Sequence, residues 1–174
     1  MNNYFLLSTE QQRMVLSQAA NRTGLPMQAV EKDLWVTVVL QQVFSLPVAK
    51  HLVFKGGTSL SKVWKVIQRF SEDIDLAIDP SIWGFEGDLT KKQIKRLRKA
   101  SSVFVRDELC QQLRNEVSSN GMDNWLNIEA EPDGEGDSTY PEPRVIHISY
   151  KSLFDNDLPY LHSEVKLEVG ARSL

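Results

Sequence analysis

The chain has only one cysteine, Cys110, among its 174 residues. A single cysteine can form neither an intrachain disulfide nor a cysteine-based zinc site, and such usage is typical of a reducing cytosol. The longest strongly apolar run, Leu34 to Leu40, is much shorter than the roughly 20 residues that cross a bilayer. The amino terminus lacks the basic segment and apolar stretch of a secretion signal. We therefore predict a cytoplasmic protein that does not enter a membrane.

A strong net charge is also missing. The formal net charge is −3, so the composition does not indicate a general nucleic-acid binder, although charge can be segregated locally. Histidine is scarce as well, and His51, His147 and His162 are scattered. None of the three has metal-ligand spacing or pairs with Cys110 or a nucleophile-elbow motif, so we interpret all three as structural.

The length predicts a single domain over residues 1–174, with N-terminal helices over 1–47 and a mixed-sheet core over 48–174. Capping and periodicity signals predict helices over 8–23, 26–44, 60–67 and 90–117, and strands over 52–54, 74–78, 126–130, 144–150 and 164–169. On the second helix we expect Val30, Leu34, Val38 and Val39 to face the core.

The order of these elements runs from helices to alternating strands and helices, and then to a run of strands. This order predicts an α+β fold with a mixed β-sheet, rather than a doubly wound parallel sheet. The acidic, Gly- and Pro-rich segment 131–143 is typical of a surface loop. The chain stops at Leu174, directly after a predicted strand, and we therefore also consider that it is a fragment of a longer protein.

Residues 54–79 carry the most informative motif, FKGGTSLSKVWKVIQRFSEDIDLAID. A diglycine turn, Gly56-Gly57, follows an apolar strand end and precedes two hydroxyls, Thr58 and Ser59. Such a turn beside a helix start offers backbone N–H groups and the positive end of a dipole. These groups favour phosphate binding, although a lone Gly-Gly-Thr more often marks an ordinary turn.

The second part of the motif is an Asp-x-Asp pair in the next predicted strand. Strand side chains alternate between faces, so Ile74 and Leu76 are expected to face the core while Asp73 and Asp75 project together on the other side. Adjacent carboxylates repel unless a cation lies between them, and hard oxygen ligands favour Mg²⁺. The ordinary alternative is an exposed strand face, but acidic residues are poor strand formers.

The last predicted strand, EVKLEVG, has the same pattern. Its apolar residues alternate with Lys166 and Glu168, which therefore share one face. If this strand lies beside the Asp-x-Asp strand, Glu168 becomes a third carboxylate and Lys166 a charge partner for a phosphate or for the acids. Two-metal nucleotidyl transfer uses such an arrangement.

Two further basic features remain open. Lys62 lies four residues after Thr58, on the same helix face, where it could contact a phosphate or be solvated. The run that includes Lys91, Lys95 and Arg98 makes a basic helix face. A solvated face is the default explanation, and contact with an RNA backbone is the alternative.

The motif KGGTSL followed by RFSEDIDL resembles the AbiEii/AbiGii toxin family of nucleotidyltransferases, which have the DNA polymerase β-type fold. The upstream segment AVEKDLWVTVVL is also similar to that family. The resemblance covers about residues 26–79, with a weaker similarity at 165–169. It implies a nucleotidyltransferase-type mixed sheet flanked by helices.

The resemblance also implies roles for individual residues. Gly56 and Gly57 would form the nucleotide-binding turn, and Asp73 and Asp75 would be paired metal ligands. Thr58 or Ser59 would hold the triphosphate, the Ser71 hydroxyl would bond a phosphate or a ligand carboxylate, and Lys166 would serve the phosphates. The family pattern continues to one more acidic residue after this lysine, a role that Glu168 supplies or that is lost where the chain ends.

Together these observations predict a metal-dependent nucleotidyltransferase that binds two Mg²⁺ ions and transfers NMP from an NTP to an acceptor hydroxyl. The resemblance makes RNA, including tRNA, a candidate acceptor. It also implies the toxin of a toxin–antitoxin or phage-defence system, with a cognate antitoxin as partner. One alternative is an inactive or truncated relative that binds a nucleotide, a nucleic acid or a protein. Another is phosphoester hydrolysis, with water as the acceptor.

Overall fold

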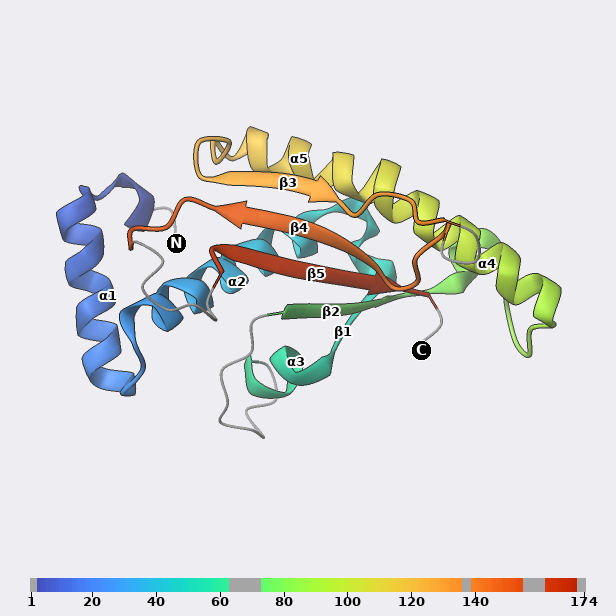
Figure 1. Cartoon of the computed structure of the whole chain (residues 1–174), viewed down its shortest axis with the longest axis horizontal. Helices are drawn as coiled ribbons and strands as arrows, with labels where there is room; N and C mark the ends of the chain where they lie inside the picture. Colours follow the sequence, from blue (N-terminus) through green and yellow to red (C-terminus); the bar gives the residue numbers. More distant parts are fainter. Residues whose placement is uncertain (1–2, 63–72, 136–138, 155–161, 172–174) are drawn as a thin grey trace.

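The computed structural model describes residues 3–62, 73–135, 139–154 and 162–171. Within these residues, five strands form one sheet in the order β1-β2-β5-β4-β3 (Figure 1). Their bounds are β1 Leu52–Lys55, β2 Asp73–Ile78, β3 Leu126–Ala130, β4 Arg144–Tyr150 and β5 Glu164–Gly170. β2 and β5 run parallel, and the other neighbouring pairs are antiparallel. The predicted α+β class with a mixed sheet is confirmed.

The first helix, α1 (Thr9–Thr23), begins and ends at the residues that its capping signals predict. The Ser8 hydroxyl accepts a hydrogen bond from the Gln11 N–H, and the Gln11 side chain accepts one from the Ser8 N–H. At the other end Gly24 adopts the left-handed conformation with φ 72°, which lacks steric cost only for glycine.

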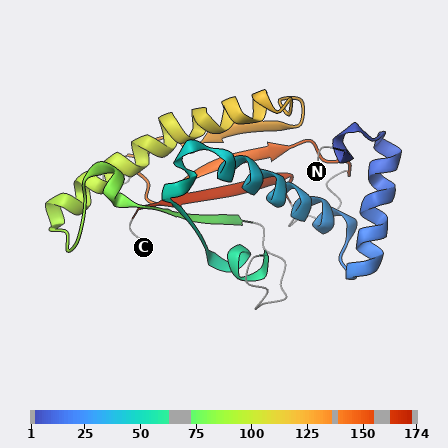
Figure 2. The same cartoon turned by 180° about the vertical axis from the view of Figure 1, so that it is seen from behind.

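The second helix, α2 (Met27–Ser45), crosses the sheet. In the view from the back of the molecule, α2 lies in front of the strands (Figure 2). The predicted buried face is only partly right. Val38 and Val39 are buried, but Val30 and Leu34 are partly exposed. Trp35 is buried instead and stacks on Tyr150 with ring centroids 5.2 Å apart. α2 packs against α1, α5 and the sheet, so its buried surface is wider than one periodic stripe.

The predicted helix over 90–117 is one continuous helical stretch with a π-helical turn inside it. α4 (Lys91–Phe104) begins with a capping box between Thr90 and Gln93. The π-helical turn (Val105–Leu109) then joins α4 to α5 (Cys110–Ser119). The described residues also form three short 3-10 helices: η1 (Tyr4–Leu6), η2 (Pro47–His51) and η3 (Pro80–Trp83).

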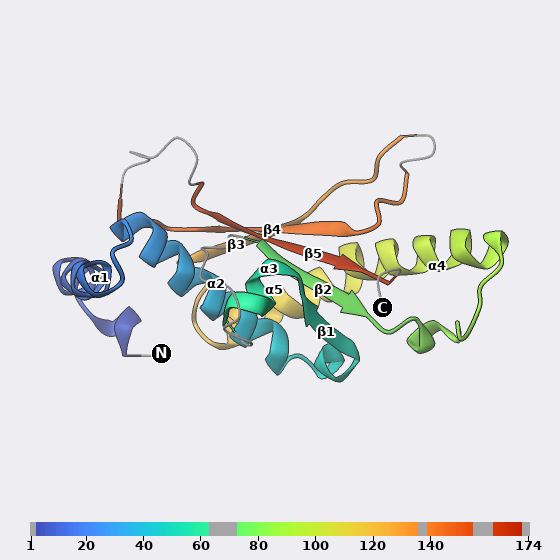
Figure 3. The ribbon, with the colours of Figure 1, turned by 90° about the horizontal axis from the view of Figure 1, so that it is seen from below.

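Three of the described helices cover one face of the sheet. α2, α4 and α5 lie on the same side of β3, β4 and β5 (Figure 3). The core residues under these helices are alternate positions of the central strands, including Ile74, Leu76, Ile146, Leu167 and Val169. The intervening residues of these strands therefore point to the opposite face.

Arg144, at the start of β4, is the largest charged side chain in the core and has no exposed surface. Its guanidinium donates to the Ser102 hydroxyl at 2.8 Å, to the Glu131 carbonyl at 2.7 Å and to the Asp133 carboxylate at 2.5 Å. These bonds join β4 to α4 and to the segment that follows β3. The arginine satisfies buried acceptors that would otherwise lack a donor.

We expect Arg144→Met to lower the free energy of unfolding by about 2–4 kcal/mol, because methionine fills the space but leaves the Ser102 and Glu131 oxygens without their donor. Urea unfolding followed by circular dichroism measures this change. The matched control is Arg22→Met, since Arg22 is exposed on α1. Equal unfolding midpoints for the two variants would show that the buried guanidinium does not stabilise the fold.

Candidate active site

The two acidic motifs lie side by side in the sheet. In the β2–β5 register Asp73 pairs with Lys166 and Asp75 pairs with Glu168. Paired residues of neighbouring strands project from the same face, so these four side chains share the face opposite α2, α4 and α5. The last strand therefore lies beside the Asp-x-Asp strand, as the sequence interpretation required.

The electrostatics of Glu168 reflect this arrangement. Partial burial raises the pKa of the Glu168 carboxyl, and the negative charges of Asp75 and Asp73 raise it further. The ammonium groups of Lys166 and Lys55 lower the pKa but do not offset these effects. Lys55, at the end of β1, is the register partner of Asp75. Three carboxylates and two ammonium groups thus interact on one surface.

Crowding of carboxylates has a consequence for stability in the absence of metal. The pKa of Glu168 in the folded protein is above its ordinary value of 4.5, so the native state binds this proton more tightly than the unfolded chain does. Below pH 4.5 both states are protonated and the fold carries no penalty. As the pH rises through the raised pKa, the fold loses stability because Glu168 must ionise while it is partly buried and beside Asp75 and Asp73.

We therefore expect Glu168→Gln to raise the melting temperature of the protein in EDTA above pH 6, and to leave it unchanged near pH 4. Thermal unfolding of both proteins between pH 4 and pH 8 measures the difference. Glu86→Gln serves as control, since Glu86 is exposed in the segment between η3 and α4. A difference that does not change with pH would contradict the raised pKa of Glu168.

The diglycine turn lies directly against this acidic group. A Cβ atom at Gly56 would lie 1.9 Å from Oδ2 of Asp75, and Gly56 has φ 73°. Both the close approach and the left-handed backbone require glycine. Helix α3 (Gly56–Lys62) starts at this glycine, earlier than the predicted start at Leu60, and residues 63–67 of that prediction lie outside the described residues.

The hydroxyls after the turn face inward. Thr58 and Ser59 are both buried, and the Thr58 hydroxyl donates a hydrogen bond to the backbone carbonyl of Asp73. This bond joins α3 to the first residue of β2. Thr58 therefore holds the diglycine turn and the acidic strand together, in addition to any contact with a nucleotide.

Lys62 is engaged away from the acidic group. Its ammonium lies 2.7 Å from the Asp33 carboxylate and donates to the Thr37 hydroxyl at 2.9 Å. Both partners are on α2, so Lys62 joins α3 to α2. Ser71, the remaining predicted phosphate contact, lies outside the described residues.

A histidine also lies on this surface. His147 is the register partner of Lys166 on one side and of Glu129 on the other. From its isolation in the sequence we interpret it as structural. The alternation in RVIHISY was the signal that places His147 on the face opposite Ile146 and Ile148.

The side chains that could hold a metal are Asp73, Asp75 and Glu168. Within the described ranges no group of three or more His, Cys, Asp or Glu side chains is gathered closely enough to hold a metal ion. The three carboxylates nevertheless share one face, where partial burial and the charges of Asp75 and Asp73 raise the pKa of Glu168. Carboxylate oxygens are the donors that Mg²⁺ prefers, so the chemistry of this donor set fits the ion.

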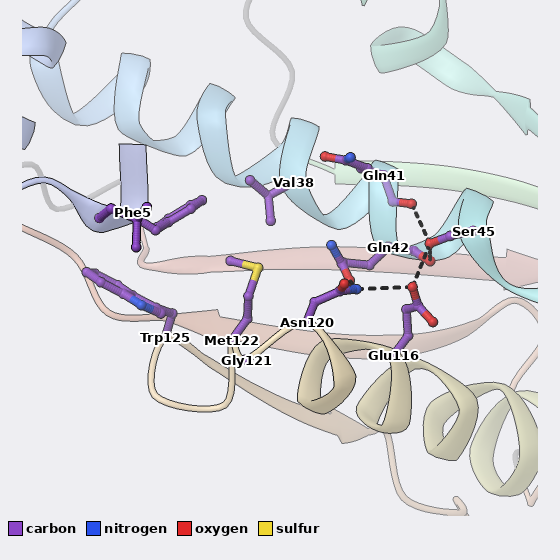
Figure 4. Close-up of a pocket in the computed structure, with 11 residues that line it drawn as sticks. Phe5, Val38, Gln41, Gln42, Ser45, Glu116, Asn120, Gly121, Met122 and Trp125 are labelled. Carbon is purple, nitrogen blue, oxygen red and sulfur yellow. Dashed lines mark hydrogen bonds between the residues drawn. The ribbon is translucent and has the colours of Figure 1, made fainter. Parts of the chain in front are cut away.

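A separate cavity of about 610 Å³ lies between η1, α2 and the end of α5 (Figure 4). Its apolar wall includes Phe5, Met122 and Trp125. On its polar side Asn120 donates to the Gln42 side chain at 2.7 Å. None of the predicted site residues lines this cavity, so it is distinct from the acidic face.

The sheet brings the paired aspartates, the lysine–glutamate strand and the diglycine turn next to one another, as the resemblance to a nucleotidyltransferase family predicts. Comparison with known families agrees, because the model of the family "Nucleotidyl transferase AbiEii toxin, Type IV TA system" matches residues 39–174. The chain belongs to this family. No curated protein and no solved structure matches the chain.

The family match confirms the recognised family and locates it. It starts within α2 at Val39 and includes the diglycine turn, the Asp-x-Asp strand and β5. The first part of the segment AVEKDLWVTVVL, which we also found similar, lies before the match. Membership in a toxin–antitoxin family implies a cognate antitoxin. In the described parts of the chain, no helix is long and apolar enough to span a bilayer.

Proposed function

We propose that this protein is a metal-dependent nucleotidyltransferase that transfers NMP from an NTP to an acceptor hydroxyl. The observation that carries the proposal is the parallel register of β2 and β5, which pairs Asp75 with Glu168 and Asp73 with Lys166 on one face. This face is opposite the helices that cover the core. The family match supports the same class of reaction.

Asp73, Asp75 and Glu168 would hold two Mg²⁺ ions. When bound, these ions supply Lewis acidity and lower the pKa of the attacking hydroxyl. Lys166 and Lys55 offset the negative charge of the triphosphate, since both ammonium groups already act on Glu168. With the two metal ions bound, the net charge of this face becomes positive, which favours a polyphosphate over a neutral ligand.

The diglycine turn would bind the nucleotide on the β1 side of the acids. Gly56 brings the backbone to the carboxylate of Asp75 without a side chain in between. Ser59 and Ser71 remain proposed phosphate contacts. Thr58 positions the turn through its hydrogen bond to Asp73, and Lys62 holds α3 on α2.

We propose RNA, including tRNA, as the acceptor. The basic helix α4 supports this, because Lys91, Lys92, Lys95, Arg96 and Lys99 are exposed on it. Exposed clusters of lysine and arginine suit contact with a phosphate backbone. Arg98, by contrast, donates to the Tyr140 carbonyl at 2.5 Å and so has a structural contact.

The test is to incubate the protein with Mg²⁺, total cellular RNA and each NTP labelled at the α-phosphate. We expect labelled RNA and released pyrophosphate, and no RNA labelling from NTP labelled at the γ-phosphate. Labelled NMP or NDP without labelled RNA would indicate hydrolysis. An NTP that binds but is not consumed would support an inactive binding protein, and either result would overturn the proposal.

A further inference from the structure

Three consecutive residues of α2, Glu31, Lys32 and Asp33, are bonded to segments that are distant in the sequence. Glu31 and Lys32 are only 2% and 4% exposed, although both side chains are ionisable. Such side chains are rarely buried to this extent unless polar partners hold them. All three residues lie before the part of the chain that the family model matches.

Glu31 binds the segment that follows β4. Its carboxylate accepts a hydrogen bond from the Ser152 hydroxyl at 2.5 Å and another from the Leu153 N–H at 2.7 Å. Figure 1 shows α2 passing the end of the sheet where β4 ends and β5 begins. The path of the chain out of β4 is therefore fixed by α2.

Lys32 binds the segment that precedes β5. Its ammonium donates to the His162 carbonyl at 3.2 Å, and β5 begins two residues later at Glu164. Lys166 is the third residue of this strand and the register partner of Asp73. Lys32 thus anchors β5 just before the lysine that is proposed to contact the phosphates.

Asp33 binds the last residue of α3, on the diglycine side of the acids. The Lys62 ammonium lies 2.7 Å from the Asp33 carboxylate, and it donates to the Asp33 carbonyl at 3.3 Å and to the Thr37 hydroxyl at 2.9 Å. The Thr58 hydroxyl holds the beginning of the same helix to the carbonyl of Asp73. Because α3 is held near both ends, the position of the diglycine turn is fixed as well.

One rigid element thus joins the two sides of the acidic group. Consecutive helix residues are about 100° apart around the helix axis, so a single turn of α2 reaches partners in different directions. A triphosphate on the acidic face would lie between the diglycine turn on α3 and Lys166 on β5. The separation of these two groups depends on α2, because α2 is bonded next to both of them.

We propose that Glu31, Lys32 and Asp33 are positioning residues that set the separation between the diglycine turn and Lys166 for the triphosphate of the NTP. This inference rests on the proposed nucleotidyl transfer. Lys62 acts through Asp33 and does not contact the phosphates, because its three N–H donors are matched by three acceptors on α2.

The first test is a double-mutant cycle of Asp33→Ala and Lys62→Met. It measures the affinity for the four NTP analogues that carry a methylene group between the α- and β-phosphates. Each single variant should lower the affinity by about tenfold, and the double variant should lower it no further, because both changes break the same bridge. Lys62→Arg, which retains the charge, should recover part of the affinity. The exposed-site controls Glu10→Ala and Lys50→Met should match the wild type.

The second test measures the β5 side in the transfer assay. Lys32→Met should lower kcat by about tenfold, because β5 loses its anchor and a small displacement of Lys166 misaligns the phosphates. Lys32→Gln retains a donor for the His162 carbonyl and should recover part of the rate. The melting temperature is measured for every variant. If Lys32→Met does not fold, Ser152→Ala repeats the test, since it removes one bond to Glu31 and buries no new polar group.

The possible failures give different results. An affinity that falls in Lys62→Met but not in Asp33→Ala would indicate a direct phosphate contact and overturn the proposal. Lower melting temperatures with wild-type affinity and kcat would indicate a purely structural role and overturn it as well. A wild-type protein that transfers no label overturns the proposed function, and the affinity cycle with the analogues then still tests the positioning.

Discussion

Asp73→Asn is expected to reduce NMP transfer by about 10³-fold or more, because several kcal/mol of transition-state stabilisation depend on the metal that this carboxylate would hold. The Asp73 side chain is exposed, and the Thr58 hydroxyl bonds its backbone carbonyl, which the substitution retains. The variant should therefore fold normally. Initial rates of RNA labelling at saturating NTP measure the effect.

Mg²⁺ gives a second readout for the same variant. Saturating Mg²⁺ should raise the melting temperature of the wild type, because a ligand that binds only the folded state stabilises it. The shift should be smaller for Asp73→Asn. Asp123→Asn is the matched control, since Asp123 is an exposed carboxylate between α5 and β3. Full transfer by the Asp73 variant would remove this residue from the proposed metal site.

Gly56→Ala is expected to lower transfer by about 10²-fold, because displacement of a catalytic group by about 1 Å costs a factor of that order. The added methyl group would lie 1.9 Å from Oδ2 of Asp75, so either the carboxylate or the turn must move. The positive φ of 73° adds backbone strain. Steady-state kinetics of the variant measure the loss.

Gly24→Ala separates strain from displacement. Gly24 has nearly the same backbone angle, φ 72°, but a Cβ atom there would meet nothing within 4 Å. Both variants should lose about 1 kcal/mol of stability from the left-handed backbone. Only Gly56→Ala should lose activity. Equal activity in the two variants would show that the position of Asp75 does not depend on a bare backbone at residue 56.

Local signals in the sequence predicted most elements well. The capping residues Ser8 and Gly24 bound α1 as expected, and β3 and β4 have the predicted bounds. Helix caps and strand alternation depend on residues that are close in the sequence, so they can be predicted from the sequence. The family resemblance was also available from short motifs and is confirmed over residues 39–174.

Contacts between distant elements were less predictable. The sequence left Lys62 open between a phosphate contact and a solvated side chain, but Lys62 bonds Asp33 and Thr37 on α2. The buried face of α2 includes Trp35 and differs from the predicted face, because α1, α5 and the sheet all pack against this helix. Glu31 is buried as well, where it accepts from the Ser152 hydroxyl and the Leu153 N–H. Each of these contacts depends on which distant segment packs against the residue. The spacing of residues in the sequence does not encode that choice.

The sequence by itself determined that Asp73 and Asp75 share one side of a strand whose other side is apolar, because strand side chains alternate. It determined the same for Lys166 and Glu168. Only the tertiary structure decided that β5 is the parallel neighbour of β2 in the register that pairs Asp75 with Glu168. The physical reason is that hydrogen bonds between strands join residues far apart in the chain, and a slip of one residue would turn Lys166 and Glu168 into the core.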